Sequence, residues 1–245
     1  MMISAVGARS GLGLSARQIA LGLRAGCRPS VTTSAADATC RIAPTPELPP
    51  EVPFEARLSA MLRGAMAEAY SFAPQPDLPL LLALPSNTAA IPFDGGRVLT
   101  ALSHDAPIDL ARSSILLGGY EAFAAALKKA SELLEVETAL QGVWVGAADS
   151  WLDPLRLRQL LAEYRIAPTT RRADPRRGQL LPGEAGVVLR LGRVANDPAG
   201  LALIREVHLG SSSAEYNAES ALALIRSKAQ SKRWLITEQN GEAVR

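Results

Sequence analysis

Residues 141–154 read Gln-Gly-Val-Trp-Val-Gly-Ala-Ala-Asp-Ser-Trp-Leu-Asp-Pro, and residues 181–191 read Leu-Pro-Gly-Glu-Ala-Gly-Val-Val-Leu-Arg-Leu. The apolar run at 142–145 predicts a buried strand, and the leucines after the proline predict an amphipathic helix that runs to residue 164. An arginine-rich loop then leads into a second strand over 187–191. Strand, helix, loop and strand form an α/β unit. The small residues at its two joints are more specific than the unit itself.

Composition sets the class of protein. With 245 residues, 48% hydrophobic and 20% charged, the chain can bury a large core as one big domain or two small ones. A formal net charge of +2 and an aromatic content of 4% argue against a nucleic-acid partner. The N-terminus lacks the apolar core of a signal peptide, and no apolar run approaches the roughly 20 residues that span a bilayer. We therefore expect a soluble, cytoplasmic α/β protein without a membrane partner.

Predicted strands alternate with predicted helices along the chain. The strands are 2–6, 78–84, 114–117, 202–209 and 234–238, and the helices are 15–24, 55–72, 97–103, 120–135 and 215–229. Residues 27–53 are expected to be irregular, with short strands at most. A turn at Asn196-Asp197-Pro198 would allow 202–209 to pair with 187–194. The alternation implies parallel βαβ units, with helices on both faces of a sheet.

Three glycines, Gly7, Gly11 and Gly13, follow the first strand and open the first helix. Their spacing resembles the dinucleotide loop of short-chain dehydrogenases. That family also needs a Tyr-x-x-x-Lys pair, and none of the four tyrosines here has the lysine. We therefore reject a dehydrogenase and interpret the glycines as serving a tight strand-to-helix turn.

Groups for catalysis or metal binding are scarce. His104 and His208 are the only histidines, and neither lies in a motif. Cys27 and Cys40 are interpreted as bystanders, because nothing around them marks a nucleophile. No cluster has metal-ligand spacing, so we expect no metal and no cofactor. The arginines of the loop could grip a phosphate, although a solvated loop face is the favoured interpretation; they are Arg171, Arg172, Arg176 and Arg177.

Three motifs in the right order resemble the β-ketoacyl synthases. The opening strand and glycine loop, followed by a helix that closes on Leu-Arg-Ala-Gly at 23–26, look like the start of that family. The two joints of the α/β unit are similar to its Val-Gly-Gly-x-Asp-Ser segment and its Pro-Gly-Glu turn. The residues that carry this similarity are Gly146, Asp149, Ser150, Pro182, Gly183 and Glu184. We expect Asp149, Ser150 and Glu184 to satisfy backbone groups at the joints.

The resemblance implies a thiolase-like fold, in which two similar halves each hold a mixed five-stranded sheet between helices. Residues 1–199 would form the ketosynthase-like first half, and 200–245 only the beginning of the second half, packed on it. Such a sheet leaves an unpaired edge, which proteins usually protect by pairing. Family members dimerise through the first half, so we expect a dimer with another thiolase-like chain or a second copy.

The chain departs from the family at its catalytic positions. A condensing enzyme carries a cysteine at the start of the helix after its third strand, where the helix dipole favours a thiolate. The corresponding positions here are Leu117, Gly118, Gly119 and Tyr120. The histidine loop of the family corresponds to Gln239, Asn240 and Gly241. The resemblance therefore implies that this chain does not catalyse condensation alone.

Two functions remain open. The first is a non-catalytic scaffold or accessory protein, and truncated thiolase-like chains of this kind resemble chaperones or adaptors of type VI secretion effectors. The second is the regulatory, cysteine-free subunit of a heterodimeric acyl-condensing enzyme, whose partner supplies the catalytic residues. A secreted effector is the expected partner in the first case. A β-ketoacyl synthase or an acyl carrier protein is expected in the second.

Overall fold

The computed structural model describes residues 1–35, 38–49, 51–75, 77–87, 91–104, 106–118, 121–163, 166, 181–194, 200–205 and 207. Six strands form one sheet in the order β5-β4-β6-β7-β1-β8. Their bounds are β1 Met2–Ser10, β4 Leu80–Pro85, β5 Ser114–Gly118, β6 Val143–Ser150, β7 Glu184–Gly192 and β8 Ala202–Leu203. The helices are α1 Ala16–Arg24, α2 Phe54–Phe72, α3 Gly95–Ser103, α4 Glu121–Val136 and α5 Pro154–Ala162. A separate hairpin joins β2, Val31–Ala35, to β3, Ala38–Ile42.

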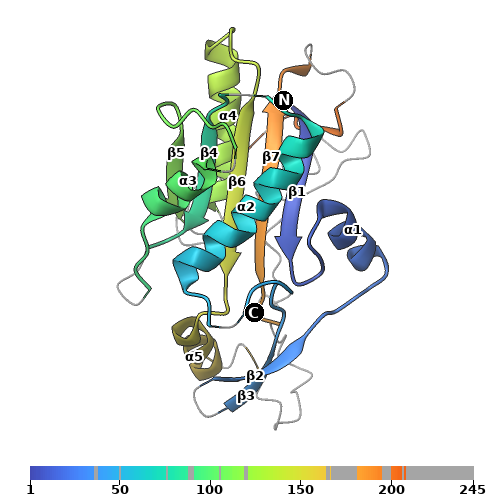
Figure 1. The fold of residues 1–245 in the computed structure, drawn as a ribbon, viewed down its shortest axis with the longest axis vertical. Coiled ribbons are helices and arrows are strands. Elements are labelled where there is room, and N and C mark those ends of the chain that lie inside the picture. The colour runs from blue at the N-terminus through green and yellow to red at the C-terminus, as the bar shows by residue number, and fades with distance from the viewer. Residues whose placement is uncertain are drawn as a thin grey trace, which may run out of the picture.

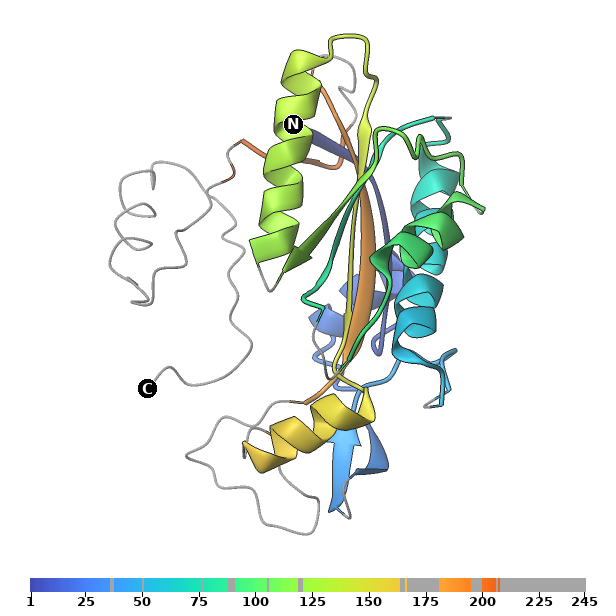
Figure 2. The same cartoon turned by 90° about the vertical axis from the view of Figure 1, so that its left-hand side faces the viewer.

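The sheet is mixed and lies between helices, which confirms the predicted fold class. β5, β4 and β6 run parallel to one another, whereas β7 is antiparallel to both of its neighbours, β6 and β1. The two-residue β8 adds a sixth strand at the far edge of the sheet. Figure 2 shows α2 and α3 against one face of the sheet and α4 against the other.

Burial on both faces explains the continuous apolar run of β4. Leu80, Leu82 and Leu84 point toward α2 and α3, together with the fully buried Trp144 of β6. Leu81 and Ala83 point to the other face, under α4. Successive side chains of a strand alternate between faces, so a strand with two covered faces has no polar position.

Helix α2 crosses the sheet diagonally (Figure 1), and Gly7 allows its close approach. A Cβ at Gly7 would lie 1.8 Å from the carbonyl oxygen of Ala65 in α2. The sequence placed Gly7 in a turn, and that prediction is wrong because β1 continues to Ser10. The turn itself is made by Ser10 and Gly13, whose backbone groups exchange two hydrogen bonds.

The ends of α1 agree with their sequence signals. The Ser15 side chain accepts a hydrogen bond from the N–H of Gln18, as an N-cap does. Gly26 follows the helix with a φ of +67°, which a side chain would strain. The sequence therefore located this helix to within a residue.

Two segments differ from the sequence-based expectation. Residues 202–209 were expected to pair with 187–194, but β8 pairs with β1, matching Met2 with Leu203. β7 cannot accept it because β6 and β1 already occupy both of its edges. The small and acidic residues 146–150 continue β6 instead of ending it. The predicted helix over 215–229 and strand over 234–238 lie outside the described residues.

A small layer of α5 and the β2–β3 hairpin closes one end of the sheet (Figure 1). Cys40 of β3 packs there with Leu152, Leu157 and Leu160 in a separate apolar cluster. None of the helices in the described part of the chain is long and apolar enough to cross a bilayer.

Candidate functional site

The carboxyl ends of β4, β5 and β6 meet at one end of the sheet, and a cavity of about 550 Å³ lies over them. Ligand sites of open α/β sheets usually lie at such strand ends. Its walls are mainly apolar and come from all three strands, α4, α5 and β7. Residues of this wall include Ala83, Leu84, Gly118, Ala122, Phe123, Ala147, Trp151, Leu155 and Val187.

Asp149 and Arg156 form the polar rim of this cavity. Nη1 of Arg156 lies 2.6 Å from Oδ1 of Asp149, and it also donates to the carbonyl of Ser150 at 2.9 Å. The guanidinium stacks over the rings of Phe54 and Trp151, with distances to the centroids of 4.7 and 5.4 Å. These contacts hold Arg156 in one place, so the rim presents a fixed charge pair beside an apolar wall.

The joint between β5 and α4 borders the same cavity and contains no cysteine or serine. Leu117 and Gly118 end β5, and Gly118 lines the cavity beside Ala122 of α4. Residues 116–121 contain neither cysteine nor serine. Gly119 and Tyr120, which the sequence also singled out, lie outside the described residues. A thiolate or alkoxide cannot form at this joint from the side chains that the sequence provides.

The two cysteines and the described histidine lie elsewhere. Cys40 is buried in β3, and burial raises the pKa of its thiol above the ordinary value. Cys27 is exposed after the end of α1, and His104 is the exposed residue that ends α3. None of the three lines the cavity. His208, the arginines at 171, 172, 176 and 177, and the loop with Gln239, Asn240 and Gly241 are outside the described residues.

The two joints that resemble the synthases meet in a buried polar cluster around Glu184, the first residue of β7. Its carboxylate lies 2.8 Å from Nη1 of Arg57 in α2 and accepts a 3.0 Å hydrogen bond from the hydroxyl of Ser150. It also accepts the backbone N–H of Thr45 at 2.8 Å. Arg57 donates in addition to the carbonyl of Pro49. The cluster thus links the loop after β3, α2 and the ends of β6 and β7.

This cluster serves structure and not chemistry. The side chains of Arg57 and Glu184 are 3% and 0% exposed, so no substrate reaches them. A buried charge pair is tolerated only when its remaining polar atoms have hydrogen-bond partners. Here the Ser150 hydroxyl and the Thr45 N–H both donate to the Glu184 carboxylate. The sequence predicted that Glu184, Ser150 and Asp149 would bond to backbone groups, and such bonds are present at all three.

Arg57 and Arg156 were missed at the level of sequence. Arg57 precedes Leu58 on a helix whose apolar face was recognised, and a charge next to that face was the available signal. Arg156 lies between the leucines of α5, where it reads as an ordinary exposed helix residue. Only the fold brings it to Asp149.

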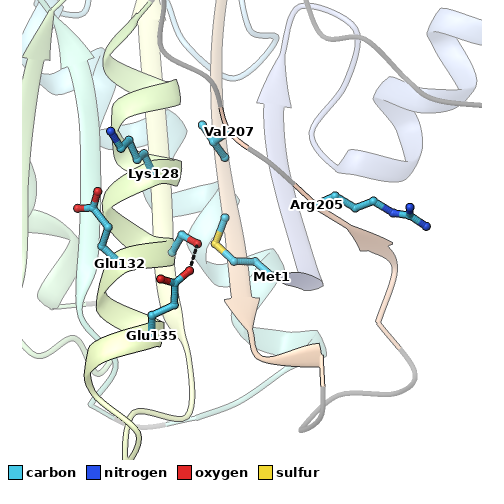
Figure 3. Close-up of a pocket in the computed structure, with 7 residues that line it drawn as sticks. Met1, Lys128, Glu132, Glu135, Arg205 and Val207 are labelled. Atoms are coloured by element: carbon cyan, nitrogen blue, oxygen red, sulfur yellow. Dashed lines mark hydrogen bonds between the residues drawn. The ribbon is translucent and has the colours of Figure 1, made fainter. Parts of the chain in front are cut away.

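A second, smaller cavity of about 190 Å³ lies on the outer face of α4 (Figure 3). Lys128, Glu132 and Glu135 of α4 border it, and Met1 reaches it from β1. Its side chains carry both signs of charge, and Arg205 points away from α4 in Figure 3. No group of three or more His, Cys, Asp or Glu residues that could hold a metal occurs in the described part of the chain.

The outer edge of β5 is open. β4 pairs with it on one side, and no described strand pairs with it on the other. The N–H of Trp144 in β6 donates to the Pro79 carbonyl, so Pro79 directs its backbone toward β6. The next residue, Leu80, donates its N–H to Ser113 Oγ, so Leu80 directs its backbone toward β5. Every second residue of a strand directs its backbone groups to the same neighbour, so Leu82 and Leu84 also face β5. Their backbone partners there are Ser114, Leu116 and Gly118. The backbone groups of Ile115 and Leu117 therefore face the open edge.

Comparison with known proteins identifies the fold. A ketosynthase from module 6 of the bacillaene synthase of Bacillus subtilis 168 superposes with a TM-score of 0.59 at 12% identity over 81% of this chain. This chain has the thiolase-like fold of ketosynthases. The ishigamide ketosynthase/chain length factor matches with a TM-score of 0.53 at 18% identity, over 79% of this chain. The ketosynthase ApeO in complex with its chain length factor ApeC, from Xenorhabdus doucetiae, matches at 0.53 and 18% over 78%.

The likeness is confined to part of those proteins. The thiolase-like chain spans 40% of the bacillaene ketosynthase, 62% of the ishigamide protein and 57% of the Xenorhabdus protein. No family model and no curated protein matches its sequence. At these identities the shared property is the fold.

Proposed function

We propose that this chain is a non-catalytic, ketosynthase-like subunit that acts by pairing with a second thiolase-like chain along β5. The joint between β5 and α4 supports the first part of the proposal, that the chain is non-catalytic. A helix N-terminus after a parallel strand lowers the pKa of a thiol placed there, which is how such a joint activates a nucleophile. Residues 116–121, Leu-Leu-Gly-Gly-Tyr-Glu, provide no thiol or hydroxyl for acyl transfer near that strand end except the phenol of Tyr120. A phenol is a poor acyl carrier.

The open edge of β5 supports the second part of the proposal, that the chain pairs with another chain along this strand. An exposed strand edge is a template for another strand, and the backbone groups of Ile115 and Leu117 are available to one. Leu117 is 52% exposed, so the edge is also apolar. Two of the structural neighbours are described as a ketosynthase with a chain length factor, which supports a partner of the same fold.

The alternative is the regulatory subunit of a heterodimeric acyl-condensing enzyme. The cavity of about 550 Å³ beside the joint at residues 116–121 favours this regulatory role, because an apolar cavity of that size can hold a small ligand. A narrower hypothesis is that the chain is an adaptor for a type VI secretion effector. It differs from the proposed scaffold role only in the identity of the partner. No described residue favours an effector, so the identity of the partner decides between these roles.

The test is purification of the full chain, with an affinity tag, from the cells that make it, followed by mass spectrometry of what is bound. The proposal predicts a second thiolase-like chain or a second copy. A synthase or an acyl carrier protein supports the regulatory subunit, and a toxin or a secretion component supports the adaptor. Condensation of malonyl and acyl thioesters by the pure chain alone would contradict both roles.

A further inference from the structure

Helix α1 has an apolar stripe that the core does not use. Ala16, Ile19, Ala20 and Leu23 recur at the spacing of one helix face. None of the residues of α1 is buried, and Leu23 is 64% exposed. An amphipathic helix normally buries such a stripe against a neighbour. Here Ala16 and Ile19 are half-buried, whereas Ala20 and Leu23 are exposed to solvent.

The attachment of α1 explains why one side of this stripe, at Ala20 and Leu23, is uncovered. A Cβ at Gly22 would lie 3.3 Å from the Leu12 side chain, so the helix rests on its own entry loop through that side. Its first turn is tied down by Glu68 of α2, whose carboxylate accepts the N–H of Ala16 at 2.9 Å. Gly22 lies about 60° around the helix from Ile19 and about 100° from Leu23, so the side of α1 that rests on Leu12 is beside Ile19 and leaves Leu23 exposed.

The charged residues of α1 and of the segments that flank it in sequence all have one sign. Residues 1–36 contain four arginines and no aspartate or glutamate, although the whole chain has a net charge of only +2. Arg9 is engaged by Glu68 at 3.1 Å. The other three, Arg17, Arg24 and Arg28, are exposed on α1 or just after it. Arg17 and Arg24 are seven residues apart, so they lie on one flank of the stripe.

We propose that α1 is a docking surface for an acidic, amphipathic helix of a partner protein. Helix-on-helix packing matches the spacing of the stripe, and flanking charges select a partner helix of opposite sign. The small side chain of Ala20 lets a second helix come close, while Leu23 and the exposed part of Ile19 supply the apolar contact. A membrane surface fits less well because α1 is only about 13 Å long and offers few large apolar side chains to lipid.

This surface is separate from the open edge used in the proposed function. β5 is at one edge of the sheet, whereas α1 follows β1 near the other edge (Figure 1). A partner helix on α1 therefore need not compete with a second thiolase-like chain on β5. The two interactions can be removed one at a time.

The experiment measures binding of two fluorescent designed peptides to the full chain by anisotropy. Both peptides are helices of about 20 residues with the same leucine stripe, flanked by glutamates in one and lysines in the other. We expect the glutamate peptide to bind at least about tenfold more tightly, and this preference to weaken with salt. The double variant Arg17→Glu with Arg24→Glu should reverse the preference, and Leu23→Ser should weaken binding several-fold. Arg97→Glu, an exposed arginine of α3, is the matched control.

Equal binding of the two peptides, or equal binding by the wild type and the double variant, would overturn the proposal. The proposal would also be overturned if the chain did not bind the glutamate peptide but sedimented with phosphatidylglycerol vesicles in a way that depends on Leu23. In that case α1 would be a membrane anchor. The variants should keep the wild-type melting temperature, since α1 buries none of its residues. A Leu117→Pro variant should bind the peptide normally, which separates this result from the proposed function.

Discussion

Glu184 is the residue on which the ends of the sheet depend. Replacement by glutamine would leave the Arg57 guanidinium buried without its counter-charge, which costs about 3–5 kcal/mol of unfolding free energy. Glu137→Gln is the matched control, because its pair with Arg112 is half exposed and screened by solvent, so its loss should cost much less. Urea denaturation of both variants measures the difference. Equal losses in the two would show that the buried cluster does not support the fold.

Cys40 and Cys27 should differ in reactivity. The raised pKa of the Cys40 thiol means that the folded state favours the protonated form. Stability from this group is therefore complete below the pKa of the unfolded thiol and declines as pH rises above it, because only the unfolded chain then releases the proton. At pH 8 we expect Ellman's reagent to modify Cys27 quickly and Cys40 only on unfolding. Fast modification of the folded Cys27→Ser variant would contradict this.

At the scale of elements, α2 packs closely against β1 at Gly7, where no side chain separates the two backbones. Gly7→Ala would place a methyl group against the Ala65 carbonyl, so α2 would have to move. We expect a loss of about 3 kcal/mol or failure to fold. Gly26→Ala, which strains a backbone with positive φ but meets no neighbour within 4 Å, should cost about 1 kcal/mol. Thermal unfolding compares them, and a milder effect at Gly7 would refute the packing.

The elements that sequence located well are those whose signal is local. The apolar run of β4, the stripe of α2 and the cap at Ser15 each depend on neighbouring residues. The polar end of β6 was missed because Asp149 and Ser150 are stabilised by partners that only the folded chain brings to them, Arg156 and Glu184. The pairing of β8 was wrong for the same reason, since only the complete sheet shows that β7 has no free edge.

The candidate site divides in the same way. The absence of a nucleophile at residues 116–121 follows from the sequence once the order of elements is known. The cavity above that joint does not, because its walls combine β4, β5, β6, β7, α4 and α5. Arg156 enters this site through stacking on Phe54 and Trp151, contacts that no spacing predicts.

At the scale of the molecule, we propose two surfaces for partners in the described part of the chain, near opposite edges of one sheet. The β5 edge offers backbone groups and suits a chain of the same fold, whereas α1 offers an apolar stripe with positive charge. A non-catalytic subunit of the kind proposed would act through such surfaces. Loss of one surface should leave the other intact, because three strands separate β5 from β1, the strand that α1 follows.

Pairing along β5 is the central claim, and a proline at position 117 addresses it directly. The Leu117 N–H faces the open edge, so Leu117→Pro removes a donor that only a partner strand would use. Leu116 keeps the extended backbone that a following proline requires. Leu117→Thr is the control, because it retains the N–H and a residue suited to strands.

The decisive measurement is native mass spectrometry of the tagged full chain purified from the cells that make it. The wild type and Leu117→Thr should appear bound to a second thiolase-like chain or a second copy, and Leu117→Pro should appear folded and unpaired. Equal pairing in the wild type and Leu117→Pro, or a wild type that is monomeric at micromolar concentration with no thiolase-like chain bound, would contradict the account.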